Sequence, residues 1–194
     1  MTERRSGMKQ LILASKSPRR KELLEKCGVP FEIDAAEIDE TLNSDCSLTD
    51  AIMDLSVRKA SAVLKRHPEA AVLGSDTIVV IDNRVLGKPH DREEARRMLE
   101  ELSGRTHQVI TGLAFVSSKK TFTDVSVSHV SFAPLSEAEI SEYLSTGEAD
   151  DKAGAYGIQE LAGRFITNID GDFYAIMGLP LSMVYQELKN IDSY

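Results

Sequence analysis

Two adjacent arginines stand at the expected start of a helix, directly after a short apolar run. Leu11–Ala14 is suited to a strand buried on both faces, Ser17 can cap the following helix, and a proline occupies its first position. The unpaired N–H groups of a helix start favour an anion. Arg19 and Arg20 oppose the helix dipole, at roughly 0.3 to 1 kcal/mol per charge, unless an anion compensates them. The segment from Ser15 to Arg20 therefore suggests an anion site, with an ordinary surface helix start as the alternative.

Acidic residues supply a second kind of chemistry. Asp76 interrupts the run Ala70–Asp82, whose other residues are typical of a buried strand. A buried carboxylate must be paired, hydrogen-bonded or bound to metal, so this position favours a functional acid over a structural one. Glu40 ends the acidic stretch Glu37–Glu40, which follows a short expected strand at Phe31–Ala35. Such acids can bind metal, although a solvated acidic loop is the more common interpretation.

Further candidate ligand groups lie on a helix and on two segments that contain glycine. Lys59 falls in the middle of the expected helix Leu48–Arg66, where alone it would pass for a surface lysine, and Lys88 stands in a Gly-Lys-Pro turn. The segment Asp150–Gly163 has three glycines and little periodicity, so its backbone can approach a ligand closely. Its expected contacting groups are Lys152, Tyr156 and Gln159.

These groups must be positioned by strands and helices that follow one another along the chain. Further strands are expected at Val85–Leu86, His107–Val116, Thr121–Ala133 and Phe165–Ile169, the middle two as an antiparallel hairpin. In the second hairpin strand Val125, Val127, Val130 and Phe132 stand among polar residues, as expected for a sheet with one wet face. Besides the two helices already named, the pattern predicts one capped by Asp91 and running to Leu102, one from Ser136 to Tyr143, and one over Leu179–Ile191.

Composition limits the class of protein. With 194 residues, 42% of them hydrophobic and 28% charged, the chain fits one domain or a closely joined pair of lobes. Cys27 and Cys46 are expected to be reduced, as in a cytosolic protein. The polar stretch Met1–Gly7 is expected to be a disordered tail, and no apolar run resembles a signal peptide or approaches the ~20 residues that span a bilayer. The net charge of −8 argues against nucleic-acid binding, yet it allows a small anionic substrate with a divalent metal.

Taken together, several motifs resemble the Maf family of nucleoside triphosphate pyrophosphatases, in that family's order and spacing. They are ASKSPRR, EIDE, the RKA around Lys59, GSDTIV, GKP, LSGRTHQVITG, DKAGAYGIQ and GLPL, and they cover the chain from Leu11 to Ile191. The resemblance implies a single α/β domain over residues 1–194, similar to inosine triphosphate pyrophosphatase. It further implies an elongated, twisted mixed sheet flanked by helices, in two lobes with a cleft between them.

The resemblance also implies a reaction and a set of residues. Water attacks the α-phosphate of a nucleoside triphosphate, which releases pyrophosphate and the monophosphate, with a divalent cation such as magnesium, manganese or cobalt. Asp76 is expected to accept the proton and Glu40 to help with metal or water, so both are candidate catalytic and metal-binding residues. Candidate substrate-binding residues are Ser15, Ser17, Arg19, Arg20, Lys59, Thr77, Lys88, Lys152 and Gln159, with Arg19 favoured over Arg20 as the direct phosphate contact.

The residues at two positions resemble those of the subfamily that takes dTTP and UTP, and they indicate a pyrimidine substrate, common or modified. They are Thr77, directly after the expected catalytic acid, and Gln159, whose amide can pair with the O4 and N3–H edge of thymine or uracil. The alternatives are a 7-methyl-GTP pyrophosphatase and a nucleotide-sensing or cell-division regulatory module without turnover. The resemblance carries an association with septum formation. A cytoplasmic protein without nucleic-acid or membrane partners is expected, and its oligomeric state stays open, a homodimer among the candidates.

Overall fold

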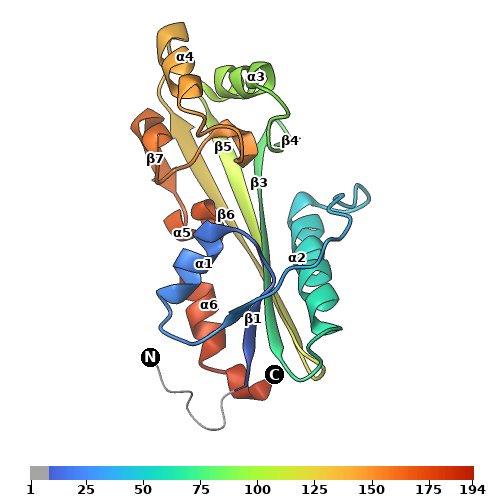
Figure 1. Ribbon diagram of the computed structural model, residues 1–194. Helices are drawn as coiled ribbons and strands as arrows, with labels where there is room; N and C mark the ends of the chain where they lie inside the picture. The colour runs from blue at the N-terminus through green and yellow to red at the C-terminus, as the bar shows by residue number, and fades with distance from the viewer. Residues whose placement is uncertain (1–8) are drawn as a thin grey trace. The chain divides into compact units, whose positions relative to one another are not determined.

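The computed structural model describes residues 9–194, so the expected N-terminal tail lies outside the described residues. A seven-stranded mixed sheet runs in the order β2-β1-β3-β5-β6-β7, with β4 paired to β3 (Figure 1). β1 is parallel to β2 and β3, whereas β4 and β7 are antiparallel to their partners. This mixed sheet with helices confirms the expected α/β class. The strands are β1 (Leu11–Leu13), β2 (Glu32–Ile33), β3 (Ala71–Ile81), β4 (Arg84–Leu86), β5 (Thr106–Val116), β6 (Thr121–Phe132) and β7 (Ile166–Asp170).

Helix starts follow the capping residues in the sequence. In α1, α2, α3 and α4 the cap side chain accepts a hydrogen bond from the backbone N–H three residues later; the caps are Ser17, Ser47, Asp91 and Ser136. The sequence predicts the caps of α1, α3 and α4, whereas for α2 it leaves Ser47 and Thr49 as alternatives. The expected closing helix Leu179–Ile191 is shorter in the structure, where α6 spans Leu181–Leu188. A further short helix, α5, precedes it and was not expected, and Gly178 at φ +123° lies between the two. The helices are α1 (Pro18–Glu25), α2 (Leu48–Leu64), α3 (Arg92–Leu102), α4 (Glu137–Ser145), α5 (Phe173–Met177) and α6 (Leu181–Leu188), with 3₁₀ turns η1 (Ala153–Ala155), η2 (Leu161–Phe165) and η3 (Ile191–Ser193).

Two compact units divide the chain. Unit 1 takes the residues up to Asp76, then 111–126 and 178–194, and unit 2 takes 77–110 and 127–177. Strands β3, β5 and β6 therefore contribute residues to both units. Both cysteines are free, as the sequence favours. Between Lys9 and Tyr194, no helix has the length and apolar content needed to cross a bilayer.

In unit 1, glycines let α2 approach the sheet closely. A Cβ added to Gly74 would lie 2.3 Å from the Ser56 carbonyl oxygen, and one added to Gly112 would lie 2.5 Å from the Ile52 carbonyl oxygen. No real Cβ atom tolerates such distances, so only glycine permits this spacing. Figure 1 shows α2 on one face of the unit 1 strands, with α1 and α6 on the other face. The close approach places the middle of α2, and with it Lys59, beside β3.

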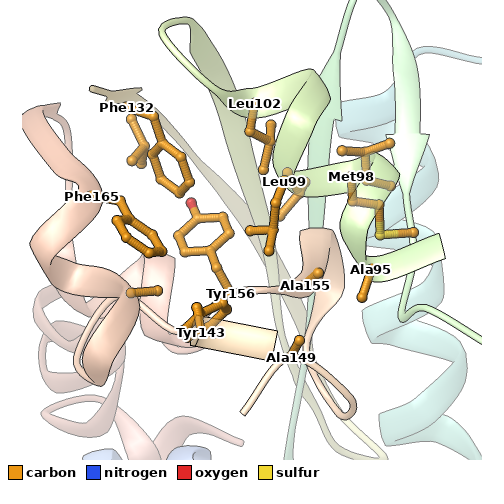
Figure 2. Close-up of a cluster of buried hydrophobic side chains, with 14 of the residues drawn as sticks. Ala95, Met98, Leu99, Leu102, Phe132, Tyr143, Ala149, Ala155, Tyr156 and Phe165 are labelled. Atoms are coloured by element: carbon orange, nitrogen blue, oxygen red, sulfur yellow. The ribbon is translucent and has the colours of Figure 1, made fainter. Parts of the chain in front are cut away.

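In unit 2, helices and a loop bury one face of the sheet. Residues of β3, β5 and β6 contribute to one core cluster, in which the buried side chains of α3 are Ala95, Met98, Leu99 and Leu102. Figure 2 shows the Tyr156 ring among Phe132, Phe165 and Leu99 in that core. Tyr156 is only 6% exposed, and its hydroxyl lies 2.7 Å from Nε2 of His107. The expectation that Tyr156 contacts a ligand is therefore wrong, because its ring fills the core beneath the glycine-rich segment.

Strand β6 alternates as predicted, but its first two valines are not on the buried face. Ser126, Ser128, Val130 and Phe132 are buried, whereas Val127 is 39% exposed. Positions 125 and 127 have the opposite parity from 130 and 132, so both pairs cannot face the core of a regular strand. The larger pair faces inward. A Cβ on Gly171, directly after β7, would lie 2.4 Å from Oγ of Ser128, so a small side chain at position 128 suits the close approach of that turn.

Candidate functional site

Asp76 lies in β3 and is held between two cations. Its Oδ2 atom pairs with Nζ of Lys59, and its Oδ1 atom lies 3.3 Å from Nη2 of Arg20. The three side chains are only 13–16% exposed. All three residues belong to unit 1. The carboxylate that interrupts the apolar strand is therefore paired, as burial requires, and two positive groups that can bind phosphate stand beside it.

Arg20 is fixed on several sides by the start of α1 and by the C-terminal part of unit 1. Its backbone N–H donates to the Ser17 hydroxyl at 3.4 Å, which is the helix cap. Its Nε donates to the Gly178 carbonyl oxygen at 2.9 Å, and its Nη1 donates to the Ser15 hydroxyl at 3.4 Å. The guanidinium thus joins α1 to Asp76. Arg19, one residue earlier in the first turn, is half-buried.

Two residues near Asp76 were not found by the sequence analysis as site residues. Ser75 is fully buried, and its hydroxyl oxygen lies 2.8 Å from the Gly112 carbonyl and 3.1 Å from the Gly178 carbonyl. The Gly178 carbonyl therefore receives both Arg20 and Ser75, which fixes the arginine and the strand on either side of the acid. Gly178 lies in the GLPL motif, but its carbonyl contacts Ser75 and Arg20, which are 103 and 158 residues away in the sequence. Contacts between such distant residues leave no local signal in the sequence.

Glu40 brings a second carboxylate to Lys59. Its Oε2 atom lies 3.1 Å from Nζ of Lys59, and its side chain is 61% exposed. Glu40 and Asp76 thus both pair with the ammonium group of Lys59. Magnesium prefers oxygen ligands and takes one or two carboxylates together with waters and substrate phosphates. Within residues 9–194, no group of three or more His, Cys, Asp or Glu side chains has a metal-binding arrangement.

The other expected substrate-binding residues lie in unit 2. Thr77 follows Asp76 on β3 and is half-buried, and Lys88 is exposed after β4. Gln159 is also exposed, and its Nε2 donates to the Glu160 carboxylate at 3.2 Å. The structure thus places these candidates in a different unit from the Asp76 group.

Lys152 is the most deeply buried of the expected ligand groups in unit 2, at 8% exposure. Its Nζ donates to the Glu148 carbonyl at 2.7 Å and to Asp151 at 2.8 Å, and it lies 2.9 Å from Glu160. Burial alone lowers the pKa of Lys152, but hydrogen bonds to the two carboxylates raise that pKa above its usual value. The lysine therefore stays charged and is engaged by its own loop.

Known proteins match this sequence over almost the whole chain. Residues 10–191 match the family model described as Maf-like protein. A dTTP/UTP pyrophosphatase from Bacillus cytotoxicus is 50% identical over 186 residues, which cover 96% of this chain and 97% of that protein. A dTTP/UTP pyrophosphatase from Bacillus anthracis is 49% identical over 187 residues, which cover 95% and 98%.

One solved structure supports the fold. The Ham1 protein of Staphylococcus aureus superimposes with a TM-score of 0.53 at 12% identity, and the match covers 94% of this chain and 99% of that one. At this identity the likeness concerns the fold alone. It agrees with the α/β fold that the sequence predicts.

Proposed function

The chain belongs to the Maf family, and we propose that it hydrolyses dTTP and UTP to the nucleoside monophosphate and pyrophosphate. The observation that carries this proposal is the group around Asp76, where a largely buried acid stands between the cations of Lys59 and Arg20. The names of relatives about 50% identical along nearly their full length support the same substrates.

The residues of unit 1 fit the needs of a phosphoryl reaction. A triphosphate carries dense negative charge, and charge-assisted donors on several elements are needed to align it and to stabilise leaving pyrophosphate. Arg19 at the start of α1 and Lys59 on α2 supply such donors. Once the substrate's oxygens engage Lys59, Asp76 is suited to accept a proton from the water that attacks the α-phosphate. Arg20 keeps Asp76 in place because its guanidinium is bound on three sides.

Glu40 and Asp76 would hold the divalent cation, since their oxygens already converge on the positive Nζ of Lys59. When bound, the cation neutralises charge on the phosphates and on the leaving pyrophosphate. Lys59 then serves the substrate rather than the two acids. We expect magnesium, manganese or cobalt to support turnover, in keeping with an all-oxygen ligand set.

Gln159 and Thr77 are the proposed contacts of the base. The amide of Gln159 can donate to O4 and accept from N3–H of thymine or uracil, whereas cytosine presents the opposite pattern. Gln159→Glu should shift the ratio of kcat/KM between dTTP and the other triphosphates by about tenfold, while the loss common to all bases stays smaller. Gln186→Glu, a change at an exposed position on α6, is the matched control. Equal losses for every base would contradict this role of Gln159.

A panel of triphosphates tests the proposed reaction. Purified protein is incubated with dTTP, UTP, CTP, ATP, GTP, 7-methyl-GTP and modified pyrimidine triphosphates, each with magnesium, manganese or cobalt. Released pyrophosphate and monophosphate are both measured. The proposal expects the highest kcat/KM for dTTP and UTP. A preference for 7-methyl-GTP would support the sister activity, and binding without turnover would support a nucleotide-sensing or cell-division regulatory module.

The cellular setting forms a separate part of the proposal. We expect a cytoplasmic enzyme that acts on free nucleotides and does not bind nucleic acid, with a homodimer as one candidate oligomeric state. A role in septum formation is tested by comparing division in cells that express wild-type protein or the Asp76→Asn variant. Equal phenotypes would separate that role from catalysis.

A further inference from the structure

Arg58 precedes Lys59 on α2 and binds the backbone of the segment that carries Glu40. Its Nη1 donates to the Asp39 carbonyl oxygen, and its Nη2 donates to the Thr41 carbonyl oxygen at 2.9 Å. These two carbonyls belong to the residues immediately before and after Glu40. One guanidinium therefore spans the backbone of the acid, while the next residue along the helix contacts its carboxylate.

The guanidinium is itself oriented by α2. Its Nε donates to Oδ2 of Asp54 at 2.8 Å, one helical turn earlier, and the Arg58 side chain is only 33% exposed. Three different nitrogens of the guanidinium are thus used, each toward a different acceptor. A planar fork can span two carbonyls in this way, whereas a lysine offers a single nitrogen at the end of a flexible stem.

The Glu40 segment is also closed by its own hydrogen bonds. Oδ1 of Asp39 accepts from the Thr41 backbone N–H at 2.9 Å and from the Thr41 hydroxyl at 2.6 Å. These bonds tighten the turn around Glu40 but do not attach it to the rest of unit 1. The attachment comes from Arg58 on one side and from the contact of Glu40 with Lys59 on the other.

We propose that Arg58 is a positioning residue, which holds the backbone of Glu40 so that its carboxylate stays beside Lys59 and Asp76. The inference rests on the proposed function for its catalytic consequence. Because the Glu40 side chain is 61% exposed, burial does little to fix it, and an anchored backbone restricts where the carboxylate can lie. Preorganised catalytic groups lose rate steeply when they are misplaced by about 1 Å.

Arg58→Met tests the inference, with Arg66→Met as the matched control. Arg66 follows the same helix and binds Asp34 through two nitrogens, at 2.7 and 2.9 Å, away from the Glu40 segment. Arg58→Met should lower kcat for dTTP about tenfold, with KM changed less than about threefold. Arg58→Lys should restore little of the rate. Arg66→Met should keep the wild-type kcat, and an equal loss in both variants would overturn the inference.

A double-mutant cycle separates positioning from general stability. If Arg58 acts through Glu40, Arg58→Met should change the rate less than about twofold in a Glu40→Gln background. Multiplicative losses, with Arg58→Met costing the same tenfold in both backgrounds, would overturn the inference. A Glu40→Gln variant with wild-type turnover would overturn it as well, while leaving the proposed pyrophosphatase activity intact.

Amide hydrogen exchange reads the positioning without any assay of activity. The Thr41 N–H should exchange at least tenfold faster in Arg58→Met than in wild-type protein, and at the wild-type rate in Arg66→Met. Unchanged exchange at Thr41 in Arg58→Met would overturn the anchoring role. Faster exchange in a protein that releases no pyrophosphate from any triphosphate would instead overturn the proposed function and the catalytic part of this inference, leaving the anchoring role supported.

Discussion

Each unit of the molecule buries one lysine against two carboxylates, but the two lysines are built into the fold differently. Lys59 in unit 1 and Lys152 in unit 2 have side chains that are 13% and 9% exposed. Lys59 projects from a long helix toward Asp76 on a central strand. Lys152 and its partners Asp151 and Glu160 all belong to the single loop region between α4 and β7.

The difference lies in which partner is buried. Asp76 is 16% exposed, whereas Asp151 and Glu160 are 63% and 32% exposed. Desolvating both members of an ion pair costs free energy that the attraction often fails to recover, so a buried pair is weak evidence for stability. The Lys59 pair is better explained by chemistry, and the Lys152 pairs by the shape of their loop.

Replacing each lysine in turn is the strongest test of whether the two lysines have different roles. Lys59→Met should lower kcat/KM for dTTP by about 10²-fold or more, because a donor to the phosphates is lost. Lys152→Met should lower kcat/KM less than about tenfold and act mainly on the thermal stability of the protein. Steady-state pyrophosphate release and melting temperature measure the two effects. Equal losses of kcat/KM would show that both lysines serve the reaction.

Two glycine substitutions, one in each unit, compare how rigid the surroundings of the two lysines are, with the free energy of unfolding as the measure. Gly74→Ala places a methyl group against the Ser56 carbonyl of α2, which cannot move without shifting the helix, so we expect a loss of about 3 kcal/mol. Gly157→Ala meets the Cε and Cδ atoms of Lys152 at 2.8 and 3.0 Å, the far end of a flexible side chain. That change should cost about 1 kcal/mol. Urea unfolding measures both, and a larger loss for Gly157→Ala would reverse the assignment of rigid and adaptable regions.

A buried histidine in unit 2 should lower the free energy of unfolding in weak acid. His107 is 2% exposed, its Nδ1 atom has no hydrogen-bond partner between Lys9 and Tyr194, and burial lowers its pKa to about 4. The unfolded state, with a pKa near 6.5, binds the proton first as the pH falls. The free energy of unfolding should therefore drop by roughly 3 kcal/mol between pH 6.5 and 4.

Urea unfolding at several pH values measures that slope. His107→Gln should flatten it, whereas His90→Gln, which removes an exposed imidazole, should leave it unchanged. An unaltered slope in His107→Gln would assign the acid sensitivity to other groups.

Local patterns were enough to predict most of the scaffold. Ser17, Ser47, Asp91 and Ser136 cap helices because each side chain bonds an N–H only three residues away. The apolar run that became β3 likewise signals its own burial. The errors share a different origin. Tyr156 faces the core and Val127 faces outward because of what packs against them from other parts of the chain, which periodicity does not record.

The chemistry of the site could be predicted by residue type more readily than by contact. A buried acid that interrupts a strand pointed to Asp76, and arginines at a helix start pointed to an anion. The contact of Arg20 with Asp76 joins residues 56 positions apart, and its contact with Gly178 joins residues 158 positions apart. Such pairings depend on the tertiary fold. The same holds for Arg58. Its place next to Lys59 is visible in the sequence, but its hydrogen bonds to the backbone on either side of Glu40 are not.

The most direct test of the central claim is the rate of pyrophosphate release from dTTP by Asp76→Asn protein. Asparagine keeps the shape of the side chain and removes the acceptor of the proton. We expect a rate at least about 10²-fold below wild type, with a melting temperature within a few degrees of wild type. Asp82→Asn, at an exposed residue beyond the end of the same strand, should keep the wild-type rate. Turnover by Asp76→Asn within about twofold of wild type would contradict the assignment of Asp76 as the catalytic acid–base group.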